Sequence, residues 1–156
     1  MSAASYNIPQ RPLQYSFLDS TIKAIPDVIS FFDTQEPLII DWKVHYFGTK
    51  DYRLQLTLYA MALKRCSPHK DFPTDLSMWE EDSLRLIEAQ LLTNQIREYS
   101  ISSDDIHKVE DYMIGSITEM RLALDSDSSL TAFDFLPTRY PEACKNCPFK
   151  KLCWEQ

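Results

Sequence analysis

Glycine is scarce in this chain, since only 2 of its 156 residues are glycine. A Walker A loop and a G-x-G-x-x-G dinucleotide-binding fingerprint both need more glycine than that, so both motifs are excluded. No apolar run approaches the roughly 18 residues of a transmembrane helix, and we expect no membrane partner. Residues 1–12 lack the basic start and apolar stretch of a secretory signal, so a cytoplasmic location is expected.

The composition is that of one globular domain, with 44% hydrophobic, 25% charged and 12% aromatic residues. The net charge of −7 is distributed unevenly. Residues 71–136 carry 4 basic and 15 acidic side chains, whereas residues 43–70 carry 6 basic and 1 acidic. The chain as a whole therefore does not have the charge of a nucleic-acid binder, although one segment is locally basic. The acidic stretch over residues 71–136 is interpreted as a solvated surface.

Hydrophobic periodicity predicts an α/β fold with a mixed central sheet flanked by helices. The predicted elements are a strand hairpin, a buried helix, a second strand pair and a long helix that Ser102 caps, over residues 22–44, 51–65, 84–101 and from 102 onward. The core face of the long helix is expected to comprise Ile106, Val109, Met113, Met120 and Leu124. Residues 1–20 are predicted to be an irregular lead-in, 21–136 the core and 137–156 a cysteine-rich tail.

Charged residues interrupt the apolar strands of the predicted hairpin. Asp27 lies on the first strand, and Asp41 and Lys43 share one face of the second because side chains alternate along a strand. A turn near residues 34–36 brings Asp27 beside Asp41. Two converging carboxylates need neutralisation, which a hard divalent cation such as Mg²⁺ provides, and a neighbouring lysine stabilises charge on a phosphoryl oxygen. Solvent exposure without any role is the alternative, but Asp41 directly follows Leu38-Ile39-Ile40.

The helix after the hairpin carries a second polar pair. Gln55 and Tyr59 are spaced i, i+4 and share one helical face. An amide and a phenol near the carboxylates could hold a phosphate or a base edge. A satisfied core glutamine and a packed core tyrosine explain the same pattern, and the spacing alone does not decide between the two.

These motifs, in this order, resemble the PD-(D/E)XK nuclease superfamily. Pro26-Asp27, Asp41-Trp42-Lys43 and Gln55-x-x-x-Tyr59 are similar to its RecB-type branch, in which a D-[WY]-K strand precedes a Q-x-x-x-Y helix. The resemblance implies a restriction-endonuclease-like core and metal-dependent hydrolysis of DNA phosphodiesters. It covers about residues 22–156, most of the chain.

The resemblance also implies a role for each motif residue. Asp27, Asp41 and the Trp42 carbonyl would bind Mg²⁺ or Mn²⁺, Lys43 would be the catalytic lysine, and Gln55 and Tyr59 would support the site and the DNA. The implied activity is that of a DNA-repair exonuclease acting on single-stranded DNA, with a helicase or another nuclease subunit as partner.

Three of the four cysteines lie in the tail. Cys144, Cys147 and Cys153 form a C-x2-C-x5-C motif, and an acidic chain without a signal argues against structural disulfides. Thiolates suit zinc or iron–sulfur, and three cysteines without a second pair fit an iron–sulfur cluster better. Unligated surface thiols are the alternative.

The tail itself resembles that of iron–sulfur RecB-type nucleases. AddB-type subunits and CRISPR-associated adaptation nucleases end with C-x2-C-P-[FY]-x3-C, and Pro148 and Phe149 match as well. This implies a [4Fe–4S] cluster that clasps the C-terminal segment, with its fourth cysteine upstream of the core. No cysteine precedes Asp27, and the family's upstream His or Glu has no counterpart in residues 1–20, so we expect the chain to be N-terminally short. Cys66, the remaining cysteine, is expected to be a small, partly buried thiol.

Two other functions remain open from the sequence. A catalytically impaired nuclease-like module would keep the fold and bind DNA or a partner without cutting. A zinc-binding interaction protein would use the tail cysteines and leave the two aspartates without a role.

Overall fold

A computed structural model describes residues 4, 6–44, 51–67, 69–72, 76–125, 145 and 147 of the chain. The chain divides into two compact units, Met1–Met113 and Ile114–Gln156. Within the described residues, no helix is both long and apolar enough to cross a membrane.

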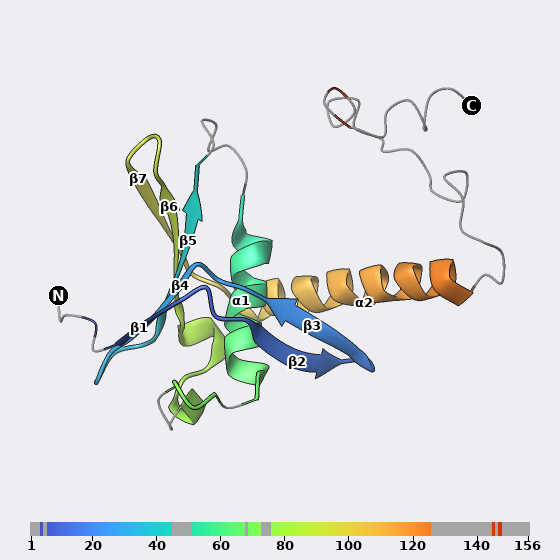
Figure 1. Ribbon diagram of the computed structural model, residues 1–156, viewed down its shortest axis with the longest axis horizontal. Coiled ribbons are helices and arrows are strands. Elements are labelled where there is room, and N and C mark those ends of the chain that lie inside the picture. Colours follow the sequence, from blue (N-terminus) through green and yellow to red (C-terminus); the bar gives the residue numbers. More distant parts are fainter. Residues whose placement is uncertain are drawn as a thin grey trace. The chain divides into compact units, whose positions relative to one another are not determined.

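The first unit is built around a five-stranded sheet with the order β1-β4-β5-β6-β7 (Figure 1). Only β5 and β6 pair in parallel; the other neighbours are antiparallel. A separate antiparallel hairpin is formed by β2 and β3. The strands are β1 Tyr6–Pro9, β2 Leu13–Phe17, β3 Ser20–Ala24, β4 Val28–Phe31, β5 Leu38–Lys43, β6 Arg85–Gln90 and β7 Gln95–Tyr99.

The helix α1, Arg53–Arg65, connects the two parallel strands and packs on the sheet and on the β2–β3 hairpin (Figure 1). Two 3₁₀ turns follow it, η1 Leu76–Met78 and η2 Glu81–Ser83. The parallel strands β5 and β6 need a long crossover connection of this kind, because both run in the same direction. The buried core joins α1 to both sheets through apolar side chains that include Leu13, Ile29, Ile39, Leu56, Ala60, Leu63 and Leu86.

The last helix, α2 Ser103–Asp125, begins with a reciprocal cap. The Asp105 amide N–H donates to Ser102 Oγ at 3.3 Å, and the Ser102 amide N–H donates to Asp105 Oδ2 at 2.9 Å. Two of the amide groups at this helix end are thereby satisfied. Val109 and Met113 pack with Met61 of α1 in a second small core. The predicted mixed α/β fold, a mixed sheet flanked by helices, is confirmed.

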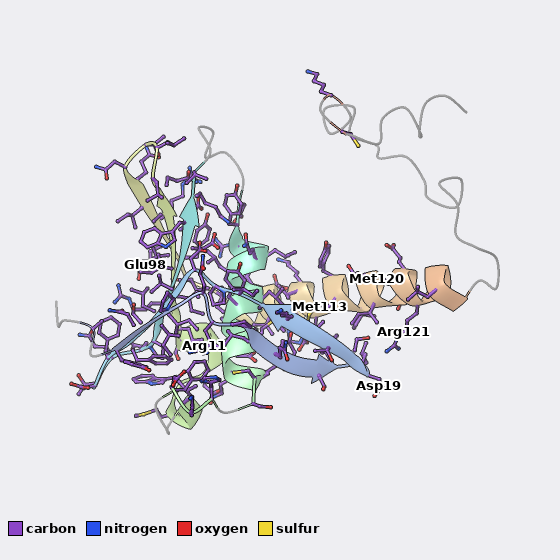
Figure 2. The ribbon with its side chains drawn as sticks, viewed as in Figure 1. Arg11, Asp19, Glu98, Met113, Met120 and Arg121 are labelled. Carbon is purple, nitrogen blue, oxygen red and sulfur yellow. The ribbon has the colours of Figure 1, made fainter. Side chains whose placement is uncertain are left out.

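Residues 1–20 differ from the expected irregular lead-in, because they contain β1, β2 and the start of β3. The turn between β2 and β3 places Leu18 and Asp19 at φ 46° and 56°. Positive φ at both central positions is what a two-residue hairpin turn requires, usually with asparagine or glycine. Here a leucine and an aspartate adopt it, and Figure 2 shows Asp19 at the tip of the hairpin. The sequence therefore carries no glycine signal for this turn.

The first strand of the hairpin predicted over residues 22–44 is also corrected, since its residues divide between two sheets. The segment Ile25–Asp27 separates β3 from β4, and its Pro26 has no N–H to donate to a strand ladder. The Asp27 carbonyl instead accepts a hydrogen bond from the Gln10 amide at 2.8 Å. Asp27 therefore lies in the break between the strands, directly before β4, rather than within a strand.

Two residues expected on the core face of the long helix are exposed. Val109, Met113 and Ile117 are buried as periodicity indicates, but Met120 and Leu124 are 63% and 75% exposed. The apolar periodicity continues along α2 beyond the buried stretch, so a pattern alone could not locate where burial ends.

Candidate metal and catalytic site

The antiparallel register of β4 and β5 brings the two candidate metal-binding aspartates together. Val28 pairs with Ile40, so Asp27, one residue before β4, lies opposite Asp41. The Asp27 carboxylate accepts a hydrogen bond from the Trp42 amide, with Oδ2 2.7 Å from the nitrogen. Asp27 is thus anchored to the backbone of the residue between Asp41 and Lys43.

Lys43 and Asp41 form an ion pair along one face of β5. The exposed fractions of their side chains are 13% and 5%, so the pair is largely removed from water. The Lys43 ammonium also donates to Gln55 Oε1 at 2.9 Å and lies 4.2 Å from the centre of the Tyr52 ring. Asp41 Oδ2 makes no hydrogen bond of regular geometry within the described residues. The same oxygen atom forms the ion pair with the Lys43 ammonium.

Gln55 links α1 to the strand residues. Its Nε2 donates to the Tyr59 hydroxyl oxygen at 2.7 Å and approaches Asp41 Oδ1 at 3.4 Å. The i, i+4 spacing on α1 makes this possible, because both side chains point to the same face of the helix. The structure therefore brings Asp27, Asp41, Trp42, Lys43, Gln55 and Tyr59 into one cluster.

Burial and neighbouring acids raise the proton affinity of this cluster. Burial is the largest cause of the raised pKa of Asp41; Lys43 opposes it, and the charges of Asp27 and Glu88 add to it. The pKa of Tyr59 is likewise raised, first by burial, with the Gln55 hydrogen bond opposing. A site with this electrostatic character attracts positive charge, and carboxylate oxygens are the donors that hard divalent cations prefer.

Two buried polar residues of β6 were not singled out from the sequence. Glu88 and Gln90 are 0% and 2% exposed, and the parallel register sets them beside Asp41 and Lys43. The Glu88 carboxylate accepts hydrogen bonds from the Gln90 amide and, at 2.6 Å, from the Tyr99 hydroxyl. The signal for them was available, because Glu88 and Gln90 lie two residues apart in a strand with Leu86, Ile87 and Ala89, and residues so spaced share one face.

No group of three or more His, Cys, Asp or Glu side chains arranged to hold a metal is found within the described residues. Of the tail cysteines, Cys144 and Cys153 lie outside those residues, whereas Cys147 is a half-buried free thiol. Cys66 ends α1, is half-buried, and its thiol donates to the Leu63 carbonyl at 3.3 Å. Burial raises the pKa of the Cys66 thiol, which disfavours the thiolate form that metals require.

Comparison with known proteins shows the family of the chain. The family model of the PD-(D/E)XK nuclease superfamily matches residues 2–154. The match spans nearly the whole chain, and the chain belongs to this superfamily. No curated protein matches it.

One solved structure that matches is described as "Crystal structure of SSO0001", with 13% sequence identity and a TM-score of 0.53. The alignment covers 96% of this chain but only 61% of that one. At this identity the likeness shows a shared fold alone.

Proposed function

We propose that this chain is a metal-dependent DNA nuclease of the RecB-like type, acting as an exonuclease on single-stranded DNA. The observation that carries the proposal is the convergence of Asp27, Asp41 and Lys43 at the ends of β4 and β5, with Gln55 bonded to the lysine. Superfamily membership supports phosphodiester hydrolysis as the reaction.

The donor set of the cluster fits a hard divalent cation such as Mg²⁺ or Mn²⁺. Asp27 and Asp41 would hold it with carboxylate oxygens, and the Trp42 carbonyl is the proposed third protein ligand. Water and substrate oxygens would complete the shell, as is usual for Mg²⁺. When bound, such a cation supplies Lewis acidity and lowers the pKa of a bound water.

Lys43 is the proposed catalytic residue. Its ammonium would stabilise the negative charge that develops on the phosphoryl oxygens, and its low exposure strengthens that interaction. Gln55 orients the ammonium through Oε1 and bonds Tyr59 through Nε2. Gln55 and Tyr59 would therefore act on the substrate through the position of Lys43.

We extend the proposal to an iron–sulfur cluster, a [4Fe–4S] cluster held by Cys144, Cys147 and Cys153. The support is the C-x2-C-P-F-x3-C spacing in the tail. Its fourth ligand would not be Cys66, whose hydrogen bond and raised pKa favour a protonated thiol. A helicase or another nuclease subunit is the proposed protein partner.

A second function is favoured by one observation. The Lys43 ammonium is paired with the Asp41 carboxylate, whose oxygens a metal would need, and this pairing suits a module that binds DNA or a partner without cleaving it. The same protein preparation distinguishes the two functions. A nuclease produces metal-dependent cleavage products, whereas the second function requires DNA binding without cleavage products.

The test uses linear and covalently closed circular single-stranded oligonucleotides with Mg²⁺ or Mn²⁺ and with EDTA. Metal-dependent loss of the linear substrate with the circle intact is the expected result for an exonuclease. Lys43→Gln should reduce kcat by roughly 10²–10³ while Mn²⁺ affinity is kept. Asp41→Asn should lose both activity and Mn²⁺ affinity.

Lys23→Gln, an exposed lysine on β3, is the matched control and should behave as wild type. DNA binding without any metal-dependent product would favour the non-cleaving module. Full activity of Asp41→Asn would contradict the proposed site.

A further inference from the structure

Two side-chain pairs run in parallel on the neighbouring strands β5 and β6. On β5, Lys43 contacts Asp41 two residues earlier; on β6, Gln90 donates to Glu88 two residues earlier. The parallel register pairs Asp41 with Glu88 and Lys43 with Gln90, and the Leu91 amide donates to the Lys43 carbonyl at 2.9 Å. Paired residues on adjacent strands point to the same face about 4.8 Å apart. The Gln90 amide group therefore lies alongside the Lys43 side chain.

The Gln90 amide has a fixed orientation and one unused acceptor. Its Nε2 is committed to Glu88, and Glu88 is itself held by the Tyr99 hydroxyl at 2.6 Å. Gln90 Oε1 therefore faces away from Glu88, and it is buried without a hydrogen-bond partner among the described residues. Buried carbonyl oxygens in folded proteins nearly always have a donor, so this one calls for a specific explanation.

Lys43 is the neighbouring donor whose partners would change on metal binding. An ammonium has three N–H groups, and here it contacts the Asp41 carboxylate, Gln55 Oε1 and the Tyr52 ring. A divalent cation on Asp41 competes for the same carboxylate and repels the ammonium. Lys43 then needs another acceptor if it is to remain in the site.

We propose that Gln90 is a positioning residue that accepts a hydrogen bond from Lys43 when a divalent cation occupies the Asp41 carboxylate. This inference rests on the proposed function, because it assumes that cation. Gln55 and Gln90 would then hold the ammonium from α1 and from β6, at the place where the phosphate charge develops. Because Glu88, itself held by Tyr99, engages Gln90 Nε2, Gln90 Oε1 is the atom left to accept from the lysine.

The test follows the ammonium itself by NMR, with the full chain labelled by ¹⁵N-lysine, with and without Mg²⁺. The Lys43 signal is assigned by its absence from Lys43→Gln. In wild type with Mg²⁺ it should shift and stay visible, because the ammonium remains hydrogen-bonded. In Gln90→Met the Lys43 signal should be visible without Mg²⁺. When Mg²⁺ is added, this signal should be lost, because the ammonium protons exchange with water. Gln95→Met is the matched control, since Gln95 is the exposed β7 partner of Gln90.

Kinetics give a second readout on the same variants. Gln90→Met should lower kcat by about tenfold, the value of one hydrogen bond, with KM and Mg²⁺ affinity unchanged. If Gln90→Met fails to fold, Gln90→Asn keeps the amide but is too short to reach both Glu88 and Lys43. It should give the same loss of the Lys43 signal.

The outcomes separate this inference from the proposed function. If Mg²⁺ leaves every wild-type signal unmoved, the metal site is wrong and the inference falls with it. If Mg²⁺ binds and the Lys43 signal in both folded Gln90 variants matches wild type, only the role of Gln90 is overturned. A loss of Mg²⁺ affinity in Gln90→Met would also contradict it, because a positioning residue for Lys43 does not bind the metal.

Discussion

Asp41 is buried beside Lys43, where the folded chain without a metal binds a proton more tightly than a free carboxyl group does. Its side chain is 5% exposed, and burial raises its pKa despite the adjacent Lys43. A carboxyl group whose pKa is higher in the folded than in the unfolded chain binds its proton more tightly when folded. The folded state therefore loses stability as the pH rises through these two pKa values, and a bound cation would restore it.

We accordingly expect Asp41→Asn to stabilise the protein in EDTA at neutral pH. The buried charge is removed, and a gain on the order of 1 kcal/mol would raise the Tm by roughly 2–4 °C. The measurement is thermal unfolding of both proteins over a pH series. The gain should disappear at a pH low enough to protonate Asp41 in wild type, which serves as the internal control. A lower Tm for Asp41→Asn at neutral pH would show that the ion pair with Lys43 outweighs the cost of burial.

For single residues, the sequence predicts which side chains lie close together when both belong to the same strand or the same helix. Alternation along β5 puts Asp41 and Lys43 on one face, and helical spacing aligns Gln55 with Tyr59. Glu88 could not be placed in the same way. Its contact with the site depends on the pairing of β6 with β5, which joins residues far apart in the chain. The catalytic and metal-binding roles of the motif residues stay predictions.

Among the elements, the β2–β3 hairpin depends on a turn that its residues adopt poorly. Leu18 has φ 46°, in the left-handed region that costs an ordinary residue roughly 1–2 kcal/mol. Asparagine tolerates this region, so Leu18→Asn should stabilise the chain by about 1 kcal/mol. Chemical denaturation measures the change. Leu92→Asn is the control, because Leu92 is similarly exposed in the β6–β7 turn but is not among the residues with positive φ.

The reciprocal cap of α2 gives a second prediction about an element. Hydrogen bonds from Ser102 hold the pKa of Asp105 below its usual value, so the folded chain gains stability once Asp105 is ionised. Asp105→Ala should lower the free energy of unfolding by about 1 kcal/mol at neutral pH. The difference from wild type should shrink as the pH falls through the depressed pKa.

Asp104→Ala is the matched control for this cap, because Asp104 is exposed in the same helical turn and pairs with Lys108 rather than with the cap. Water and salt screen such an exposed pair, so the effect of Asp104→Ala should be smaller than that of Asp105→Ala. Equal effects of the two variants would mean that charge near the helix end matters more than the cap.

Elements with strong periodicity were predicted, and elements defined by turns were not. The helix from residue 51 to 65 and the strand pair over 84–101 are confirmed as α1 and as β6 with β7. The strands β1 and β2 are short, and positive φ occurs at Gln10 and Leu18 without glycine. Propensity gives no turn signal at such positions, so tertiary packing decides the conformation.

For the molecule as a whole, the tail cysteines make the proposed cluster testable. Anaerobic reconstitution with iron and sulfide should load wild type and Cys66→Ser equally, because the Cys66 thiol is half-buried and bonded to the Leu63 carbonyl. Cys147→Ser should lose the iron, since it breaks the close cysteine pair. We expect the wild-type cluster, which the three tail cysteines would hold, to be lost in air. Iron and sulfide per chain, with the visible absorbance, are the measurements.

Loss of iron in Cys66→Ser, with a full cluster in wild type, would identify Cys66 as the fourth ligand and overturn this assignment. Zinc uptake by wild type in place of iron would instead favour a zinc-binding tail.

The parallel pairing of β5 with β6 also determines when the candidate site is completed during folding. In the chain, α1 and both 3₁₀ turns lie between β5 and β6, so the contact between these two strands is of long range. Long-range parallel pairing is slow, because loop closure is costly before the contact forms. During synthesis, Asp41 and Lys43 emerge well before Glu88 and Gln90. The nascent chain therefore presents the apolar β5 with one open edge to other chains, and aggregation competes with the closing of the sheet.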